Sequence, residues 1–407
     1  MPNRGNVSGV VRLLPKMRHR VFYGHPWVFS NEIESVEGTY EPGDIVEVRD
    51  RRQRFVGLGF INPQSTIAVR ILTREQRSIN DEFFRERIAM AIGHRKLMYG
   101  VAGSLGDHPG GFRLAFSEAD FLPGLVADIF GGYLAFQTLT LGIDRWKDTI
   151  VRALVDQVSP KGVYERNDAP VRRLEGLGLQ SGYIGGSFDP LVEMDENGVR
   201  MLVDVQRGQK TGYFLDQTDN RLAVRRFCAG KTVLDAFCYS GGFGLSATKA
   251  GAQHVVFLDA SQAALDLARA TAERNGVLEK VSFHAGNAFD LLRQLDGTGA
   301  RFDVVMLDPP AFARSRKMAE RALAGYKEIN LRAMRLVKEG GFLCTSSCSQ
   351  HVTTQEFDGM LADAASDANS SVRIVVSQGQ RADHPILAGV PETEYLKFRV
   401  CQVFKSI

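Results

Sequence analysis

The second half of the chain alternates between short apolar runs and longer stretches in which apolar residues recur at helical spacing. Five apolar runs predict β-strands, at residues 232–235, 254–259, 281–284, 304–308 and 341–346, with helices between them. Strands that alternate with helices predict an α/β fold built on a parallel, doubly wound sheet. Ligands of such sheets bind beyond the carboxyl ends of the strands, so the residues just after each strand are candidates for function.

The first 75 residues have a different pattern. Short β-branched runs at residues 10–13, 44–48 and 66–71 are separated by Gly, Pro and Asn, which predicts a small β-rich domain. Asn80 can cap a helix whose apolar residues recur at helical spacing as far as about Tyr99.

A second small α/β domain is predicted to follow this helix. Its expected elements are strands at 113–116, 124–128 and 133–138, a helix at 145–157 and a hairpin turning at 196–198. Two charged segments, 118–125 and 164–168, are interpreted as turns. We therefore predict three domains, at residues 1–75, 76–195 and 196–407.

Composition narrows the class of protein. With 44% hydrophobic and 24% charged residues, the chain resembles an ordinary globular protein, and it contains no apolar run long enough to cross a bilayer. The N-terminus lacks the apolar core of a signal peptide, so we expect a cytoplasmic protein without a membrane partner. Five cysteines without a C-x-x-C pair predict neither a disulfide framework nor a metal site.

Charge is uneven along the chain. Residues 1–80 hold twelve Lys and Arg against eight Asp and Glu, although the whole chain carries a net charge of only +3. Such an excess on its own is more often a solvated surface than a nucleic-acid site. It is compatible with a polyanionic partner and does not establish one.

A glycine-rich turn between the first predicted strand and its helix, at residues 233–244, is the candidate cofactor site. Glycines let a ligand approach the backbone, and the helix N-terminus offers free N–H groups. The turn also satisfies the dinucleotide fingerprint G-x-G-x-x-A, so it fits NAD as well as S-adenosylmethionine. Asp235 favours the methyl donor, because its carboxylate suits an ammonium group and would repel a pyrophosphate.

The next two strand ends supply further cofactor candidates. A carboxylate at Asp259 can accept both hydrogen bonds of a ribose diol, and an amide at Asn287 can read an adenine edge or simply form an Asx turn. We assign the following residues to cofactor binding: Asp235, Phe237, Tyr239, Ser240, Gly241, Gly242, Asp259, Ala260, Ser261, Asn287, Ala288, Asp308 and Pro309.

The segment Asp308-Pro309-Pro310-Ala311-Phe312 at the fourth strand end is the strongest discriminator between cofactors. Two prolines hold a stiff, extended loop whose carbonyls and aromatic ring can present a planar base beside a donor methyl group. A dehydrogenase has no use for such a loop here. The segment therefore predicts methylation of a nucleic-acid base.

Cys348 follows the fifth strand and is the candidate nucleophile. Carbon 5 of cytosine attacks a sulfonium methyl poorly until a thiolate adds at carbon 6 and raises its electron density. We expect Cys348 to form this adduct and Asp308 to hold the polar edge of the base. Cys238 is a weaker alternative thiol. The base that removes the carbon-5 proton is unassigned, with His351 a nearby residue that is more often part of a loop.

Several segments together resemble the RlmI-like family of large-subunit (23S) rRNA cytosine-C5 methyltransferases, over essentially the whole chain. They are residues 25–29, which resemble the start of a PUA domain, together with 209–217, 235–244, 308–312, 347–349, Gln380, 383–385 and 394–397. The resemblance implies an N-terminal RNA-binding PUA domain, a central β-β-α-β-β domain and a C-terminal Rossmann-like class I methyltransferase domain, often as a homodimer.

The resemblance also implies roles for individual residues. Cys348 would be the nucleophile, S-adenosylmethionine the cofactor, and large-subunit rRNA the partner. A segment that closes over the donor or holds RNA would include Gln209, Lys210, Phe214, Asp216 and Arg221, with Pro310 and Phe312 near the substrate base. Read from the residues alone, Phe214 is equally a core residue and Arg221 a surface charge.

Two alternatives stay open at this point. Many RNA cytosine-C5 enzymes carry a second cysteine after the fourth-strand proline, where this chain has Pro310-Ala311, and similar loops occur in enzymes that methylate purine nitrogens. The chain could therefore be an rRNA guanine or adenine N-methyltransferase in which Cys348 is structural. It could also be a non-catalytic RNA-binding ribosome-assembly factor.

Overall fold

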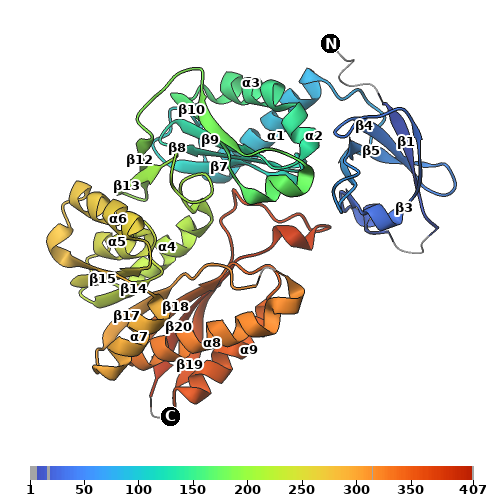
Figure 1. Ribbon diagram of the computed structural model, residues 1–407. Coiled ribbons are helices and arrows are strands. Elements are labelled where there is room, and N and C mark those ends of the chain that lie inside the picture. Colours follow the sequence, from blue (N-terminus) through green and yellow to red (C-terminus); the bar gives the residue numbers. More distant parts are fainter. Residues whose placement is uncertain (1–6, 16–18, 314, 406–407) are drawn as a thin grey trace. The chain divides into compact units, whose positions relative to one another are not determined.

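A computed structural model describes residues 7–15, 19–313 and 315–405 (Figure 1). The chain divides into two compact units. The N-terminal unit comprises Met1–Met194, Val203–Leu215 and Ala382–Thr393, and the C-terminal unit comprises Asp195–Leu202, Asp216–Arg381 and Glu394–Ile407. The chain thus returns to the N-terminal unit at residue 382, which the sequence pattern did not indicate.

The N-terminal unit begins with a six-stranded sheet in the order β2-β6-β5-β4-β1-β3. Its strands are β1 (Gly9–Leu13), β2 (Trp27–Val28), β3 (Ile33–Gly38), β4 (Ile45–Arg49), β5 (Phe55–Ile61) and β6 (Val69–Thr73). Side chains alternate across each strand, and those on the inner side form a core that includes Val11, Val28 and Val48. The predicted β-rich module is confirmed.

The helix expected after this sheet is α1 (Asp81–Tyr99). The Asn80 side chain accepts a hydrogen bond from the backbone N–H of Phe83 at 3.0 Å, as its capping role requires. A five-stranded sheet follows, in the order β11-β10-β9-β8-β7. Its elements are β7 (Gly111–Phe116), β8 (Leu125–Phe130), β9 (Tyr133–Thr138), α2 (Leu141–Arg145), α3 (Lys147–Val158), β10 (Gly162–Asn167) and β11 (Gln180–Ile184). Three strands precede its helices and two follow.

One turn prediction in this region is wrong. Residues 164–167 lie in strand β10 and are buried, although three of the four are polar or charged. Their polar groups are satisfied inside the domain: Glu165 pairs with Lys147 at 2.9 Å, and the Asn167 amide donates to the Thr138 hydroxyl at 2.7 Å. The local pattern suggested a turn because the partners are distant in sequence. Residues 118–125, by contrast, form a short 3₁₀ turn (Ser117–Asp120) and its exit into β8.

The predicted hairpin is formed by β12 (Leu191–Glu196) and β13 (Val199–Asp204). Asn197 and Gly198, at its turn, have φ angles of 53° and 81°. Two consecutive left-handed residues are the geometry that favours an Asn-Gly turn.

The C-terminal unit contains a seven-stranded sheet in the order β16-β15-β14-β17-β18-β20-β19. Its strands are β14 (Thr232–Ala236), β15 (His254–Asp259), β16 (Val281–Ala285), β17 (Phe302–Leu307), β18 (Val337–Ser347), β19 (Ser371–Gln378) and β20 (Lys397–Phe404). The first five run parallel, and β20 is antiparallel to both of its neighbours. All five predicted strands are confirmed, whereas β19 was not predicted.

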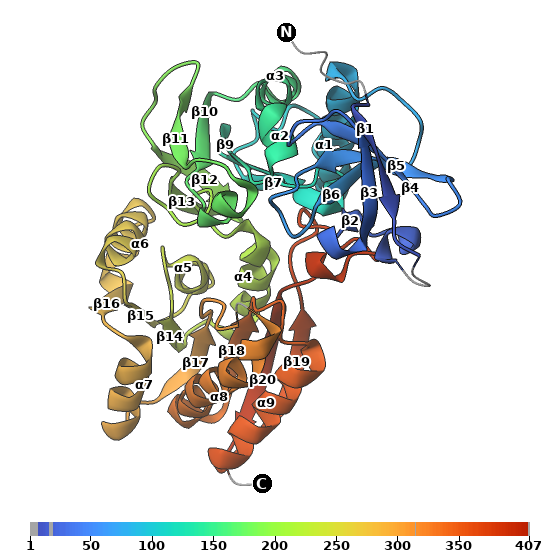
Figure 2. The same cartoon turned by 45° about the vertical axis from the view of Figure 1, so that its right-hand side comes forward.

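Helices cover both faces of this sheet (Figure 2). On one face, α7 (Ala288–Gly297), α8 (Ala319–Leu336) and α9 (Thr354–Asp367) enclose a core with Leu234, Val305 and Leu343. On the other face, α5 (Gly242–Lys249) and α6 (Gln262–Arg274) pack against β14, β15 and β16, and α4 (Thr218–Val224) packs on α5. This is the predicted α/β architecture.

Within residues 7–15, 19–313 and 315–405, no helix is long and apolar enough to cross a membrane. The same residues contain no cluster of three or more His, Cys, Asp or Glu side chains that could hold a metal ion.

Candidate active site

Strand register brings four strand ends to one edge of the sheet in the C-terminal unit. Ala236 of β14 pairs with Leu258 of β15 and with Leu307 of β17, and Leu307 pairs with Thr345 of β18. The residues that follow these four positions therefore lie in one row: Phe237, Asp259, Asp308 and Ser346. The predicted cofactor and substrate residues at these strands are brought together.

Asp235 is fully buried beneath the glycine turn. Its Oδ2 accepts a hydrogen bond from the backbone N–H of Gly244 at 2.7 Å, but its Oδ1 has no partner among the described residues. Burial raises the pKa of Asp235 to about 8, and the neighbouring carboxylates of Asp308 and Asp259 act in the same direction. An unpartnered, buried carboxylate oxygen is costly, so this site favours a cationic ligand group.

The glycine turn has an unusual backbone. Phe237 and Tyr239 have φ angles of 60° and 48°, and Gly241, at the start of α5, has a φ of 82°. Such angles cost non-glycine residues about 1 to 3 kcal/mol each and cluster at ligand sites. The turn also packs tightly, because a Cβ atom at Gly244 would lie 2.2 Å from the Phe257 ring. This close packing gives the glycine motif a structural role as well.

Ser240 lies in the same turn and is fully buried, and its hydroxyl has no hydrogen-bond partner in the described part of the chain. Gly241 and Gly242 begin α5 beside it. With Asp235, the turn therefore contains two buried oxygen atoms whose hydrogen-bonding capacity is unused.

Asp259 is the acidic residue at the end of β15. Its Oδ2 accepts from the backbone N–H of Tyr239 at 2.8 Å, and its Oδ1 accepts from that of Ser261 at 2.8 Å. These bonds fix the carboxylate and leave a lone pair on each oxygen. Ser261 caps α6, with its hydroxyl 3.3 Å from the backbone N of Ala264, and Ala260 is exposed between the two.

Asn287 takes the local role that the sequence left open. Its Oδ1 accepts from the backbone N–H of Phe289 at 2.9 Å and caps α7, while the residue is exposed. Ala288 is buried directly after it. The side-chain amide N–H groups of Asn287 are not used by this cap, so capping and contact with a ligand are compatible.

Asp308 has a tightly held carboxylate. Its Oδ1 accepts from the Gln217 amide at 2.8 Å and from the Ser346 hydroxyl. Burial raises the pKa of Asp308, and the nearby Asp216 carboxylate adds to the effect. Ser346 was not predicted as a site residue, and Gln217 was included only within the segment of family resemblance at 209–217. Gln217 is 91 positions from Asp308 in sequence, so no local pattern could reveal their contact.

The residues of the proline loop after β17 differ in how far they are exposed. Pro309 is buried, whereas Pro310 is exposed. The Phe312 ring packs on Tyr326 with ring centroids 4.6 Å apart and is only partly buried. The aromatic that was expected to face a base is therefore also a member of the core formed with α8.

Cys348 differs from the other four cysteines, all of which the structure describes. Those four are buried. Burial raises the pKa of the Cys228 and Cys401 thiols to about 12. It raises the pKa of Cys238 and Cys344 well above the usual range. Cys348 is partly exposed, and its Sγ lies 3.9 Å from the Pro309 carbonyl oxygen. It is therefore accessible and beside the proline loop.

The predicted lid segment is divided between the units. Gln209, Lys210 and Phe214 belong to the N-terminal unit, where the Lys210 ammonium lies 4.8 Å from the Phe214 ring centroid. Asp216 and Arg221 belong to the C-terminal unit.

The interpretation of Arg221 as a surface charge is wrong. Its side chain is buried and pairs with Glu196 at 2.7 Å, and its charge acts on both Asp235 and Asp308. Asp216, for its part, accepts a hydrogen bond from the Tyr395 hydroxyl at 2.6 Å. A short local pattern could not reveal either set of distant partners.

The site fits S-adenosylmethionine better than a dinucleotide. Asp259 and Asp308, in the strand-end row, act electrostatically on Asp235 deeper in β14, and such a set of acidic groups disfavours a pyrophosphate and favours an ammonium or sulfonium group. The unused oxygens of Asp235 and Ser240 can accept hydrogen bonds from a ligand. The choice that the glycine turn left open is therefore resolved by its neighbours.

Comparison with known families and solved structures supports this assignment. Residues 11–74 match the PUA-like domain, and residues 181–390 match the S-adenosylmethionine-dependent methyltransferase family. The crystal structure of SMU.776 complexed with SAH is 19% identical and superimposes with a TM-score of 0.82, covering 98% of this chain and all of that one. At this identity the likeness concerns the fold.

Curated relatives are closer in sequence. "Ribosomal RNA large subunit methyltransferase I" of Photobacterium profundum is 41% identical over 93% of this chain and 95% of its own length. The protein of that name from Shewanella denitrificans is 40% identical over 97% of this chain and 99% of its own length. The chain therefore belongs to the S-adenosylmethionine-dependent methyltransferases and, within them, to the family of ribosomal RNA large subunit methyltransferase I.

Proposed function

We propose that this enzyme forms 5-methylcytidine in large-subunit rRNA through a covalent adduct between Cys348 and carbon 6 of the target cytosine. The observation that carries the proposal is the position of the thiol: Cys348 is the one cysteine of five that is not buried, and it lies against the loop that begins with Asp308.

S-adenosylmethionine, when bound, supplies an electrophilic methyl group on a sulfonium. Asp235 and Ser240 would hold its polar end, and Asp259 would hold its ribose diol. Each oxygen of Asp259 accepts one backbone N–H bond, which fixes the carboxylate in place, and each can accept a second hydrogen bond, from a hydroxyl of the diol. The strained turn at Phe237 and Tyr239 brings the backbone to the ligand.

The residues of this chain account for the chemistry at the base. The Cys348 thiolate adds to carbon 6, and a proton moves to ring nitrogen 3, so that carbon 5 becomes nucleophilic and can take the methyl group. Loss of the carbon-5 proton then allows the carbon–sulfur bond to break, which releases the thiolate, and nitrogen 3 gives up its proton. Asp308 is suited to the nitrogen-3 proton, because burial raises its pKa and Gln217 and Ser346 fix its orientation.

The RNA substrate is proposed on the relatives' printed name and on the PUA-like match at residues 11–74. A cytosine must leave its stack to reach a pocket at the strand ends, and an RNA-binding module can hold the surrounding RNA shape while the pocket reads one nucleotide. In this proposal residues 1–75 bind RNA, 76–195 form the central domain and 196–407 perform the methylation.

The test supplies labelled S-adenosylmethionine and total RNA to wild-type protein, Cys348→Ala and the control Cys401→Ala. We expect labelled 5-methylcytidine from the wild type and from the control, and a loss of at least about 1000-fold in Cys348→Ala. Nucleoside analysis identifies the product.

Other outcomes distinguish the alternatives. Labelled methylguanosine or methyladenosine, with Cys348→Ala still active, would identify a purine N-methyltransferase. S-adenosylmethionine binding without any transfer to ribosomal RNA or ribosomal particles would indicate a non-catalytic assembly factor. Either outcome contradicts the covalent mechanism.

A further inference from the structure

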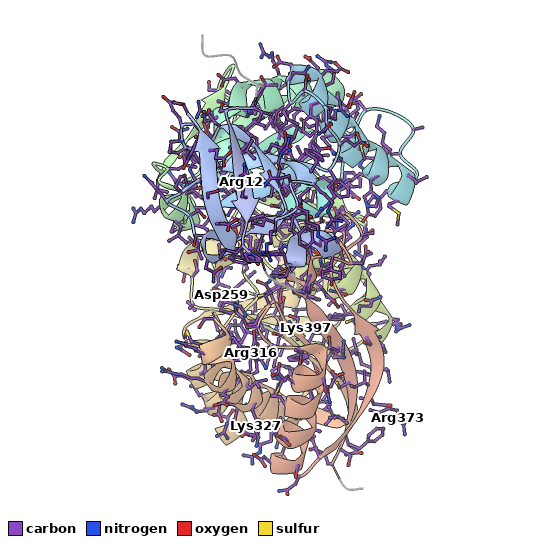
Figure 3. All side chains as sticks on the ribbon, turned by 90° about the vertical axis from the view of Figure 1, so that its right-hand side faces the viewer. Arg12, Asp259, Arg316, Lys327, Arg373 and Lys397 are labelled. Atoms are coloured by element: carbon purple, nitrogen blue, oxygen red, sulfur yellow. The ribbon has the colours of Figure 1, made fainter. Side chains whose placement is uncertain are left out.

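Lys397 is a buried lysine whose ammonium group is held by backbone carbonyls. It begins β20 and is only 5% exposed (it is labelled in Figure 3). Its ammonium donates to the backbone carbonyls of Ser349 and Tyr395, at 2.7 and 2.8 Å. Among the described residues no carboxylate lies within 4.0 Å of it. Buried lysines are rare unless they are paired, so a nearby anionic group would stabilise the charged form of Lys397.

The strand pairing puts Lys397 beside Cys348. Lys397 is directly opposite Ser347 in the antiparallel pair of β18 and β20, and Cys348 is the next residue along the chain. The carbonyl that holds the ammonium belongs to Ser349, on the other side of the cysteine. Lys397 and Cys348 also interact electrostatically, in the direction that favours a charged pair.

The loop around Cys348 is held rigidly from a third element. The Tyr326 hydroxyl of α8 lies 2.8 Å from the Ser349 hydroxyl, which also accepts from the backbone N–H of Ala313 at 3.3 Å. Burial raises the pKa of Tyr326, so its phenol is neutral when a thiol ionises. The tyrosine therefore positions the loop and supplies no competing charge.

The other charged groups around Lys397 already have partners or are solvated. Glu356 of α9 pairs with Arg316 at 2.7 Å, Arg399 of β20 pairs with Asp358 at 2.8 Å, and Glu394 is exposed. All three act on Lys397 at longer range. The Cys348 thiol is thus the group in this cluster whose ionisation would compensate the buried ammonium.

We propose that Lys397 is the cation that stabilises the thiolate of Cys348 and keeps it available for attack. The inference rests on the proposed covalent function, in which Lys397 acts through Cys348 and is therefore a positioning residue. Burial lowers the pKa of Lys397 to about 8, so the positive charge beside Cys348 is present below this pH and is lost as the pH rises through it.

The test measures the reactivity of Cys348 directly, independently of methylation. Full-length protein is alkylated with iodoacetamide from pH 6 to 10, and modification of Cys348 is followed by peptide mass spectrometry. In the wild type we expect the pKa read from this profile to lie below the ordinary thiol value of about 8.5. In Lys397→Met it should rise by at least about one pH unit, which slows alkylation at pH 7 about tenfold.

Two further variants serve as controls. Lys397→Arg keeps the charge and should keep most of the effect. Lys405→Met removes another lysine whose pKa is lowered by burial. Lys405 lies just beyond the far end of β20, where its ammonium donates to the Met334 carbonyl. This variant should leave the alkylation profile of Cys348 unchanged. Thermal unfolding and S-adenosylmethionine binding check that each variant is folded.

An unchanged profile in folded Lys397→Met would overturn the inference. If that variant does not fold, a wild-type thiol pKa of about 8.5 or above overturns it instead. The result is separable from the proposed function: active Cys348→Ala enzyme refutes the covalent mechanism whatever the thiol pKa, whereas inactive Cys348→Ala with no effect of Lys397 refutes only the present inference.

Discussion

Two buried carboxylates of the N-terminal unit, Asp120 and Asp128, differ from Asp235 of the C-terminal unit in how they are paired. In the N-terminal unit, Asp120 is paired with Arg95 at 2.5 and 2.7 Å, and Asp128 is paired with Arg113 at 2.7 Å through both oxygens. In the C-terminal unit, Asp235 is at least as deeply buried but has a single backbone hydrogen bond and no cation within 4.0 Å among the described residues. Burial raises its pKa to about 8.

From this difference we expect the paired carboxylates to stabilise the fold and Asp235 to serve a ligand. A buried carboxylate with a bidentate arginine is satisfied by the fold itself, and losing one partner leaves an uncompensated charge. A buried carboxyl without a cation, such as Asp235, keeps its proton up to about pH 8, and a cationic ligand would favour its ionised form. The strained residues Phe237 and Tyr239 lie next to the second kind, in the C-terminal unit.

The largest effect is expected from breaking a satisfied pair. Arg95→Met removes a fully buried guanidinium that also donates to the backbone carbonyls of Arg113, Ala91 and Asp383, and it leaves Asp120 charged and buried. We expect a loss of about 3 to 5 kcal/mol in the free energy of unfolding. Urea denaturation measures it. A loss below about 1 kcal/mol would contradict the stabilising role of the pair.

The converse substitution is Asp235→Asn, which removes a buried carboxyl that the fold does not pair with a cation. We expect unchanged or higher stability without ligand, and S-adenosylmethionine affinity weakened by about 10- to 100-fold, or about 1.4 to 2.8 kcal/mol. Calorimetric titration measures the affinity. Equal affinities in variant and wild type would remove Asp235 from the cofactor site.

The pH dependence of stability provides a third comparison. The pKa of Asp235 in the folded protein, about 8, is above the value of about 3.9 in an unfolded chain, so the folded state binds more protons between these limits. The protonated Asp235 carboxyl therefore makes its full contribution to the free energy of unfolding below about pH 4, and this contribution is lost as the pH rises through about 8. Its slope is at most about 1.4 kcal/mol per pH unit.

Unfolding by urea at several pH values between about 5 and 8 measures this slope in the ligand-free protein. In Asp235→Asn the decline should be shallower, because the titrating group is gone. Identical slopes in wild type and variant would show that Asp235 is ionised throughout this range. Asn80→Ala serves as the control, since it removes a helix cap without changing a titratable group, and Asp235 still titrates in it.

The sequence predicted those features that depend on local pattern. The strands of the doubly wound sheet follow from apolar runs, and the start of α1 follows from the capping residue Asn80. The sequence also predicted that Asp235, Asp259 and Asp308 lie at the carboxyl ends of their strands, where the structure has them, and their role in ligand binding stays a prediction.

Features that depend on distant partners could not be predicted in this way. Residues 164–167 of β10 were interpreted as a turn because of their charge. The partners that satisfy their polar side chains lie on other elements and are not visible in the local pattern. Lys397 was noted only within a segment of family resemblance, since its relation to Cys348 arises from the antiparallel pairing of β20 with β18. Arg221 was misjudged because its partner Glu196 lies on the predicted hairpin, 25 residues earlier.

The smallest expected effect compares two helix caps, one in each unit. Asn80→Ala and Ser261→Ala each remove a side-chain acceptor from the first turn of a helix, α1 and α6, and each should cost about 1 kcal/mol in stability. Only the second cap adjoins Asp259, whose Oδ1 accepts from the backbone N–H of Ser261. We therefore expect S-adenosylmethionine affinity to fall severalfold in Ser261→Ala and to stay at the wild-type value in Asn80→Ala. Equal affinities in the two variants would mean that Ser261 serves its helix alone, as Asn80 does.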